Sequence, residues 1–409
     1  MPTYSETETQ FLLPLLMVLV VIPMLATDIY LPAIPSIGED LIASHSSLML
    51  TLTSYMAGYS ISLVLSGALS DLYGRRVIVL CGLFIFALAS LASSFVISVE
   101  QLICCRFFQA LGGGCSTLLA RVTVRDLYDF KSQVRVLSYL AAGLIASPIL
   151  GPIIGAHLTI HFGWRSIFYA LTFFAFTSFG LMYIFMRESL TSALTNDSIS
   201  FTNIFKKYLA LFTHREFLFH TLVISFAWTV YFSFISSSPG LIQQIYQLSP
   251  LEYSYLFSLS ISGYIFGTIF IRRNIERIDL KDLIYFSGLI ILISTSLLVI
   301  FSLLGIESLF MLLPCIFLSL FGVGIIFPAT QAGVTRSFNS DIGLISGLFY
   351  SIEMMFGAFA SLILSNLSKA SWVSTSLLML CAAVAIITLS CLDRFSSLRL
   401  IGRSAKRLS

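Results

Sequence analysis

The stretch Gly67-Ala68-Leu69-Ser70-Asp71-Leu72-Tyr73-Gly74-Arg75-Arg76 decides the fold of this chain. An apolar run ends just before it, and another begins just after it. Between the two runs lie one acid, one glycine that permits a tight turn, and two adjacent arginines. This pattern is typical of two membrane helices joined by a short basic loop, which should face the cytoplasm. We expect Gly67 to admit a neighbouring helix, and Asp71 to face either a helix N-terminus or the arginines.

The composition indicates an integral membrane protein built from helices. Of the 409 residues, 57% are hydrophobic and only 11% are charged, which is more apolar surface than a soluble domain can bury. The net charge of +3 is scattered over the loops, so we expect no nucleic-acid partner. The seven cysteines form no C-x-x-C pair, and we expect no disulfide, no metal site and no cofactor.

Twelve apolar runs are long enough to cross a bilayer, since a span needs about 20 apolar residues. An even number of spans places both chain ends on the same side of the membrane. The sequence thus predicts an all-α membrane protein with twelve transmembrane helices, over residues 11–34, 47–69, 77–97, 100–122, 134–158, 165–186, 216–238, 253–271, 281–303, 308–331, 341–366 and 371–391.

The basic residues are distributed unevenly between the two ends of these spans. Twenty of the 23 Lys and Arg residues lie on one side, in or beside the loops that follow the even-numbered spans and in the C-terminal tail. Only Arg165 and Lys369 lie on the other side, and Arg106 lies inside a span. Because positive loops remain in the cytoplasm, both termini are predicted to be cytoplasmic.

The chain divides into two halves. Residues 54–69 and 254–269 align without a gap, with six identities in sixteen positions, which indicates two parallel repeats. A long polar gap separates the two sets of six spans, and its part at 201–212 is either a plain linker or a helix on the membrane surface. The predicted division is an N-terminal six-helix lobe at 1–187, a cytoplasmic linker at 188–215, a C-terminal six-helix lobe at 216–393 and a basic cytoplasmic tail at 394–409.

Three stretches resemble motifs of the major facilitator superfamily. The loop at 67–76 resembles its signature G-x-L-[SA]-D-[RK]-x-G-R-[RK], from which Leu72 departs. The stretch from Arg106 to Gly112 resembles R-x-x-Q-G-x-G, with Ala110 in place of a glycine. Residues 147–156 resemble the antiporter motif G-x-x-x-G-P-x-x-G-G, with Ser147 and Ala156 at its two ends.

A narrower resemblance is carried by Thr27-Asp28-Ile29-Tyr30-Leu31-Pro32-Ala33 and by Ile235-Ser236-Ser237-Ser238-Pro239. Both are similar to stretches of the bicyclomycin and chloramphenicol resistance (Bcr/CflA) transporters, a group of drug:proton antiporters. The resemblance implies twelve helices in two pseudo-symmetric six-helix lobes and a location in the bacterial inner membrane. It also implies a monomer whose partners are a small-molecule substrate, protons and the lipid bilayer.

Charges inside the apolar runs are candidates for proton coupling, because an ionisable group within a span is costly unless it has a partner or a function. Asp28 and Arg106 each lie about seven positions from the outer end of a span, so we expect them at similar depth and near each other. Asp28 would take the proton and Arg106 would modulate it; the alternative is a static ion pair that holds the lobe together. Glu353 is either a second proton site or substrate contact, or a protonated structural acid.

The remaining site residues are predicted from the motifs and from their positions in the spans. The fifth span is either a hinge or a kinked helix whose small residues pack against the other half. Aromatic residues either line a central cavity or pack between helices. The predicted sets are Met24, Thr27, Asp28, Tyr55, Tyr59, Gln109 and Tyr231 for the substrate cavity; Gly67, Asp71, Gly74, Arg75 and Arg76 for a gating loop; and Ser147, Pro148, Gly151, Pro152 and Gly155 for the antiporter motif.

Together these features predict a proton-coupled secondary transporter that exports small drug-like or amphipathic compounds by alternating access, and so confers antibiotic resistance. Rival interpretations are export of a dedicated metabolite such as a siderophore, uptake of a nutrient, and a non-transporting membrane receptor or scaffold. A receptor would be favoured by a large soluble signalling domain, which the sequence does not contain. We do not expect an enzyme, because neither a nucleophile with its base nor a set of metal ligands is visible.

Overall fold

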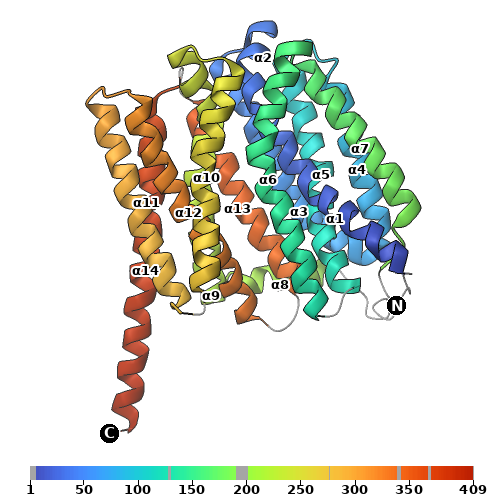
Figure 1. Cartoon of the computed structure of the whole chain (residues 1–409). Coiled ribbons are helices and arrows are strands. Elements are labelled where there is room, and N and C mark those ends of the chain that lie inside the picture. The colour runs from blue at the N-terminus through green and yellow to red at the C-terminus, as the bar shows by residue number, and fades with distance from the viewer. Residues whose placement is uncertain are drawn as a thin grey trace. The chain divides into compact units, whose positions relative to one another are not determined.

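The computed structural model describes residues 6–127, 130–189, 201–275, 277–338, 342–366 and 370–408 (Figure 1). Each regular element within these ranges is a helix. The elements are α1 (Glu6–Asp28), η1 (Leu31–Ala33), α2 (Ile34–Asp40), α3 (His45–Tyr73), α4 (Arg75–Ser93), α5 (Val99–Leu127), α6 (Phe130–Phe162), α7 (Arg165–Phe185), α8 (Phe201–Leu211), α9 (Arg215–Ser238), η3 (Pro239–Gln244), α10 (Pro250–Asn274), α11 (Leu280–Leu303), α12 (Leu309–Ser337), α13 (Ile342–Ser365) and α14 (Trp372–Leu408).

Most of these helices are suited to a membrane. Within the described ranges, 11 helical segments are long and apolar enough to cross one. α6, with 33 residues, covers the predicted span 134–158. The predicted all-α membrane fold is therefore confirmed. Many large apolar side chains lie exposed on the helices, among them Phe173, Ile293 and Phe310, as surfaces that face lipid require.

The first span is interrupted. α1 ends at Asp28, and the chain continues through η1 into the short helix α2. Pro32 and Pro35 explain the interruption, because proline has no backbone N–H for the helical ladder and its ring crowds the preceding turn. The break is fixed by Tyr30, whose hydroxyl lies 2.8 Å from Oγ1 of Thr51 on α3. Asp28 therefore lies at a helix end, which the predicted span 11–34 did not reveal.

The helices group into two compact units, of which the first comprises residues 1–210, 235–258 and 341–370. Inside it, α3 and α5 approach backbone to backbone: a Cβ added to Gly58 would lie 2.4 Å from the carbonyl oxygen of Phe107. Gly67 has no such neighbour, since the nearest atom to an added Cβ would be Cδ2 of Leu118 at 3.6 Å. The prediction that Gly67 admits a close helix is wrong, because the helices meet closely nearer to Gly58.

The second unit comprises residues 211–234, 259–340 and 371–409. Its helices α10 and α12 pack closely in the same manner. A Cβ on Gly263 would lie 2.2 Å from the carbonyl oxygen of Phe317, and a Cβ on Gly267 would lie 2.1 Å from that of Phe321. This parallel between α3 with α5 and α10 with α12 agrees with the sequence repeat between 54–69 and 254–269.

The division into two six-helix lobes stays a prediction. Residues 190–200 of the expected linker lie outside the described residues, and its later part forms α8. The compact units do not follow the middle of the chain, since 235–258 and 341–370 group with the first unit. The expected tail continues α14 as a helix as far as Leu408.

Candidate functional site

Asp28 is the last residue of α1, and only 5% of it is exposed. The carboxyl end of a helix carries unpaired carbonyl groups and a partial negative charge, which disfavour a carboxylate at that end. One hydrogen bond from the described residues offsets this cost: the Ser147 hydroxyl of α6 donates to Oδ2 of Asp28 over 2.6 Å. A buried acid at an unfavourable helix end is a candidate proton carrier.

The glycines of the antiporter motif pack against the end of α1. A Cβ on Gly151 would lie 2.7 Å from Cβ of Asp28, and a Cβ on Gly155 would lie 2.1 Å from the carbonyl oxygen of Ile29. Only glycine permits these approaches. The expectation that these small residues face the other half is wrong for both glycines, because α1 fills the space in front of them.

Serines from the chain's second half contact α6 at its carbonyl groups. Ser258 and Ser254 of α10, both in the first unit, donate to the carbonyl oxygens of Ile149 and Pro152 over 3.0 and 2.9 Å. Pro148 and Pro152 lie within α6, where each removes a backbone donor. α6 thus touches α1 through glycines and α10 through carbonyl groups.

Arg106 of α5 is fully buried. The central carbon of its guanidinium lies 4.5 Å from the ring centroid of Tyr30 and 4.0 Å from that of Tyr55. Nη1 donates to the carbonyl oxygen of Ala26 over 3.1 Å and to Oε1 of Gln109 over 2.6 Å. Because Ala26 lies in the last turn of α1, the cation stabilises the negative end of that helix, and two aromatic faces stabilise the cation.

Gln109, three residues beyond Arg106 on the same helix α5, connects Arg106 to the neighbouring helix α4. Its Oε1 accepts from Arg106, and its Nε2 donates to Oγ of Ser90 on α4 over 2.7 Å. Ser90 in turn donates to the carbonyl oxygen of Phe86. Both ends of the Gln109 amide are therefore engaged in positioning Arg106, and its predicted contact with a substrate stays a prediction.

Asp28 and Arg106 do not form the ion pair that their predicted depths favoured. Among the ion pairs within the described ranges, none joins these two side chains. The break in α1 is the physical reason. It leaves the carbonyl group of Ala26 to accept from Arg106, while the Asp28 carboxylate accepts from Ser147 instead.

Glu353 of α13 is 1% exposed and belongs to a second buried cluster in the first unit. Arg121 of α5 hydrogen-bonds Tyr350, with its guanidinium 4.9 Å from the ring centroid, and acts electrostatically on Glu353. Tyr59 of α3 interacts with the same charges and donates to Oγ1 of Thr117 over 2.9 Å. The cluster thus joins an acid, a guanidinium and two phenols from three helices.

The loop that decides the fold is held together by three carboxylates. Arg75 is only 6% exposed, forms an ion pair with Asp71, and places its Nε 3.3 Å from Oδ2 of Asp126 at the end of α5. The Glu188 carboxylate accepts the backbone N–H groups of Arg75 and Arg76 over 2.9 and 3.2 Å, and so caps the N-terminus of α4. Of the two expected orientations of Asp71, the structure has the one that faces an arginine.

The same loop interacts with α8. Burial and the nearby Asp71 carboxylate raise the pKa of Tyr208 to about 12, so this phenol stays neutral at physiological pH. Lys206 and Lys207 are exposed on the same helix. That exposure fits the alternative of a helix on the membrane surface, which stays a prediction.

The predicted cavity residues are divided between the two compact units. Tyr231 belongs to the second unit, where its ring centroid lies 5.1 Å from that of Trp228. Tyr59 lies in the Glu353 cluster. A cavity shared by all of them therefore stays a prediction. Met24, Thr27 and Asp28 lie in the last turns of α1, and Tyr55 of α3 donates to the carbonyl oxygen of Pro23 in that helix. Gln109 of α5 reaches α1 only through Arg106.

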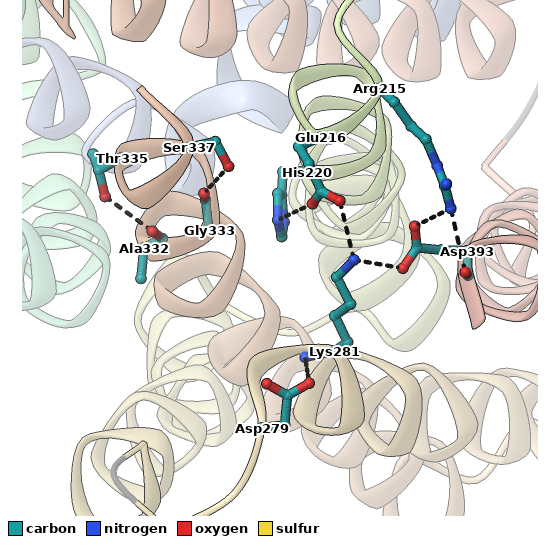
Figure 2. A network of polar contacts seen from close by, with 10 residues as sticks. All are labelled: Arg215, Glu216, His220, Asp279, Lys281, Ala332, Gly333, Thr335, Ser337 and Asp393. Carbon is teal, nitrogen blue, oxygen red and sulfur yellow. Dashed lines mark hydrogen bonds and ion pairs between the residues drawn. The ribbon is translucent and has the colours of Figure 1, made fainter. Parts of the chain in front are cut away.

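A charged network joins three helices of the second unit (Figure 2). Nζ of Lys281, at the start of α11, lies 3.1 Å from Oε1 of Glu216 and 2.8 Å from Oδ2 of Asp393. Nη2 of Arg215 lies 2.7 Å from the other carboxylate oxygen of Asp393, whose side chain is only 3% exposed. His220 lies 3.7 Å from Glu216 in the same network. Alternating charges thus connect α9, α11 and α14.

Sequence reasoning missed the acids that complete these networks. Asp126, Glu188 and Asp393 follow or end predicted spans, where an acid resembles ordinary loop polarity. Of their basic partners, Arg75 and Arg76 were predicted as part of a gating loop, whereas Arg215 and Lys281 were used only to assign topology. The sequence does contain one indication of these acids. Each of them lies near the same predicted membrane face as several arginines or lysines, which could act as its partners.

Comparison with known proteins places the chain in a family. The sequence profile of the Major Facilitator Superfamily matches residues 16–361. The chain belongs to the major facilitator superfamily. The predicted family is thereby confirmed, and the protein is a multi-pass membrane transporter of the secondary type and not an enzyme.

Similar members of the superfamily include drug-resistance proteins. Multidrug resistance protein D of Escherichia coli (strain K12) is 29% identical over 328 residues, which are 80% of this chain and 81% of that protein. Chloramphenicol resistance protein of Pseudomonas aeruginosa is 25% identical over 377 residues, which are 92% of this chain and 88% of that protein. The crystal structure of a D-xylose-proton symporter matches with a TM-score of 0.75 at 14% identity, over 92% of this chain and 97% of that chain, which shows a shared fold.

Proposed function

We propose that this transporter exports small drug-like or amphipathic compounds in exchange for protons, by alternating access across a bacterial inner membrane. One observation carries the proposal: Asp28 is a buried acid at the break in the first span, and its hydrogen-bond donor belongs to the antiporter-motif helix α6. The similarity to proteins named for multidrug and chloramphenicol resistance supports the substrate class.

In this proposal, the exchange of substrate for protons depends on the charge of Asp28. A proton from outside neutralises the carboxylate after the substrate has left, and release of that proton to the cytoplasm prepares the site for the next substrate. Each protonation of Asp28 changes the net charge near the end of α1 by one unit, while Arg106 stays bound to the carbonyl oxygen of Ala26 in that helix. Such a change favours one packing of α1 against α6 over another. Glu353 is the second proton carrier, with Arg121 as its electrostatic partner.

The proton gradient is large enough for this task. At an assumed 100 mV, one charge that crosses the membrane contributes about 2.3 kcal/mol. One pH unit contributes about 1.4 kcal/mol more. Together these hold roughly a 500-fold gradient of a neutral substrate for each proton exchanged. A single carboxyl group therefore supports useful efflux.

A substrate panel in cells that overproduce the protein tests the proposal. Compounds are scored for efflux with and without a proton uncoupler, in the wild type and in Asp28→Asn. We expect the wild type to show uncoupler-sensitive efflux, and Asp28→Asn to bind a neutral substrate without proton-driven efflux. Asp40→Asn is the matched control, because Asp40 follows in the same span but pairs with Arg165 at an exposed position. A full proton-driven gradient in Asp28→Asn, or uptake in place of efflux, would contradict the proposal.

A further inference from the structure

The side chain that touches Asp28 is unusual for its position. Ser147 stands at the first residue of the antiporter motif, where the motif itself has glycine. Its hydroxyl donates to Oδ2 of Asp28 over 2.6 Å, and Ser147 is only 3% exposed. Glycine or alanine would fit the same space without providing a donor. The residue therefore adds a chemical function to a position where the motif requires only small size.

A hydroxyl group suits both states of a carboxyl group. Toward a charged carboxylate it donates, as it does in this structure. Toward a protonated carboxyl group it can accept, and turn its own proton to the carbonyl oxygen of Gly143, four residues earlier on α6. Neither state then leaves an unpaired polar group in a buried site, which would cost about 1–3 kcal/mol.

The contact also connects Asp28 to a helix that packs closely against it. Gly151 and Gly155, one and two turns beyond Ser147, bring α6 against Asp28 and Ile29. A change at the Asp28 carboxyl group is thus transmitted to α6 through a hydrogen bond and through direct backbone packing. Two phenols from other helices, Tyr55 of α3 and Tyr253 of α10, also act electrostatically on Asp28. Their hydroxyl groups bond elsewhere, to the carbonyl oxygen of Pro23 and to Oγ of Ser238, and Arg106 is engaged with Ala26.

We infer that Ser147 is a positioning residue that pairs with Asp28 in both of its protonation states and so links proton binding to the packing of α6. This inference rests on the proposed function of Asp28 but makes a separate statement, because it concerns the partner of the carboxyl group and not whether protons drive transport. Ser147 has no role in binding a substrate in this scheme.

Infrared difference spectroscopy of the purified full-length protein tests the inference without a substrate. The Asp28 carboxyl band is assigned as the band lost in Asp28→Asn, and its intensity is followed against pH. We expect Ser147→Ala and Ser147→Gly to move the midpoint of this titration to higher pH by about one unit, because the bond donated to the charged carboxylate is stronger than the bond accepted from the protonated carboxyl group, and its loss therefore costs the charged form more. Ser147→Thr retains the hydroxyl and should keep the wild-type midpoint. Ser178→Ala is the control, because Ser178 is similarly buried on α7 and bonds only the carbonyl oxygen of Phe174 among the described residues.

If Ser147 contributes only to packing, the variants that change the Asp28 titration midpoint should be the other ones. The smaller residues alanine and glycine would then behave as the wild type, while threonine would disturb the contact with α1. That outcome would overturn the inference. If Ser147→Thr does not fold, the alanine and glycine variants still decide, because a pure packing role leaves their midpoint unchanged. Failure of the proposed function would appear elsewhere, as proton-driven efflux that survives in Asp28→Asn.

Discussion

The carboxylate of Glu188 fills the place that a side chain on residue 74 would occupy. A Cβ added to Gly74 would lie 2.3 Å from Oε2 of Glu188. The absence of a side chain lets the carboxylate reach the N–H groups of Arg75 and Arg76, where the positive end of α4 stabilises it. The segment after α7 is thereby attached to the loop between α3 and α4, two parts of the chain more than 100 residues apart.

Gly74→Ala should therefore be damaging for two reasons. The residue has φ +96° and ψ +150°, a backbone conformation that side chains oppose at a cost of about 1–3 kcal/mol, and the new methyl group would displace Glu188. We expect a lower melting temperature of the purified protein and loss of efflux. Gly163→Ala separates the two effects, because Gly163 has φ +77° but nothing within 4 Å of an added Cβ. Equal losses in both variants would mean that Glu188 contributes nothing measurable.

Arg106→Lys should destabilise the first unit although it keeps the charge. An ammonium group lacks the flat face that lies against Tyr30 and Tyr55, and it cannot reproduce both bonds of Nη1 with the same geometry. We expect a loss of about 2 kcal/mol, measured by thermal unfolding in detergent. Arg165→Lys is the control, since Arg165 also lies over an aromatic ring but at a half-exposed site, where less than about 1 kcal/mol is at stake. An equal effect at both sites would argue against a special environment at Arg106.

Asp393→Asn should destabilise the second unit, because it leaves Arg215 and Lys281 facing a neutral amide (Figure 2). The Asp393 side chain is almost fully buried while its partners are partly exposed, so we expect a loss of about 1–3 kcal/mol. A double-mutant cycle with Lys281→Met measures the pair directly. Asp282→Asn, which removes the exposed partner of Arg394, should cost under about 1 kcal/mol. A coupling energy near zero would show that the contact between Asp393 and Lys281 does not stabilise the second unit.

Much of the fold was predictable because one physical requirement dominates it. In a bilayer each span must be long, apolar and helical, so the lengths of the apolar runs locate the helices before any tertiary contact is known. The loop at 67–76 was recognisable for a related reason. Its glycine, acid and arginines carry local constraints, and the structure places Asp71 and Arg75 in direct contact.

The partners of the buried charges were not predictable in the same way. Depth in the membrane suggested that Asp28 and Arg106 would meet, but depth does not determine the direction of a side chain. The break at Pro32 and Pro35 gave Arg106 a helix end to bind, and a serine on α6 took the place of the expected cation beside Asp28. Close helix approaches likewise depend on where two helices cross, which is why Gly58 and not Gly67 has the tight contact.

Glu353→Gln should alter the number of protons exchanged without unfolding the protein. Glutamine has nearly the same shape, and Oε2 of Glu353 has no hydrogen-bond partner within the described part of the chain, so the main cost to the folded state is the lost attraction between Glu353 and Arg121. If Glu353 carries a second proton, the variant should exchange one proton fewer for each substrate molecule. At 100 mV and one pH unit, the largest gradient that it sustains would then fall by roughly 500-fold. The number of protons exchanged for each substrate molecule is obtained in proteoliposomes, with a compound identified in the substrate panel. It follows from the pH gradient at which exchange just stops. Tyr350→Phe is the matched control, because it removes a phenol from the same cluster while it keeps the acid and the aromatic ring near Arg121. An unchanged proton number in Glu353→Gln would assign this acid to packing and leave Asp28 as the proposed proton carrier.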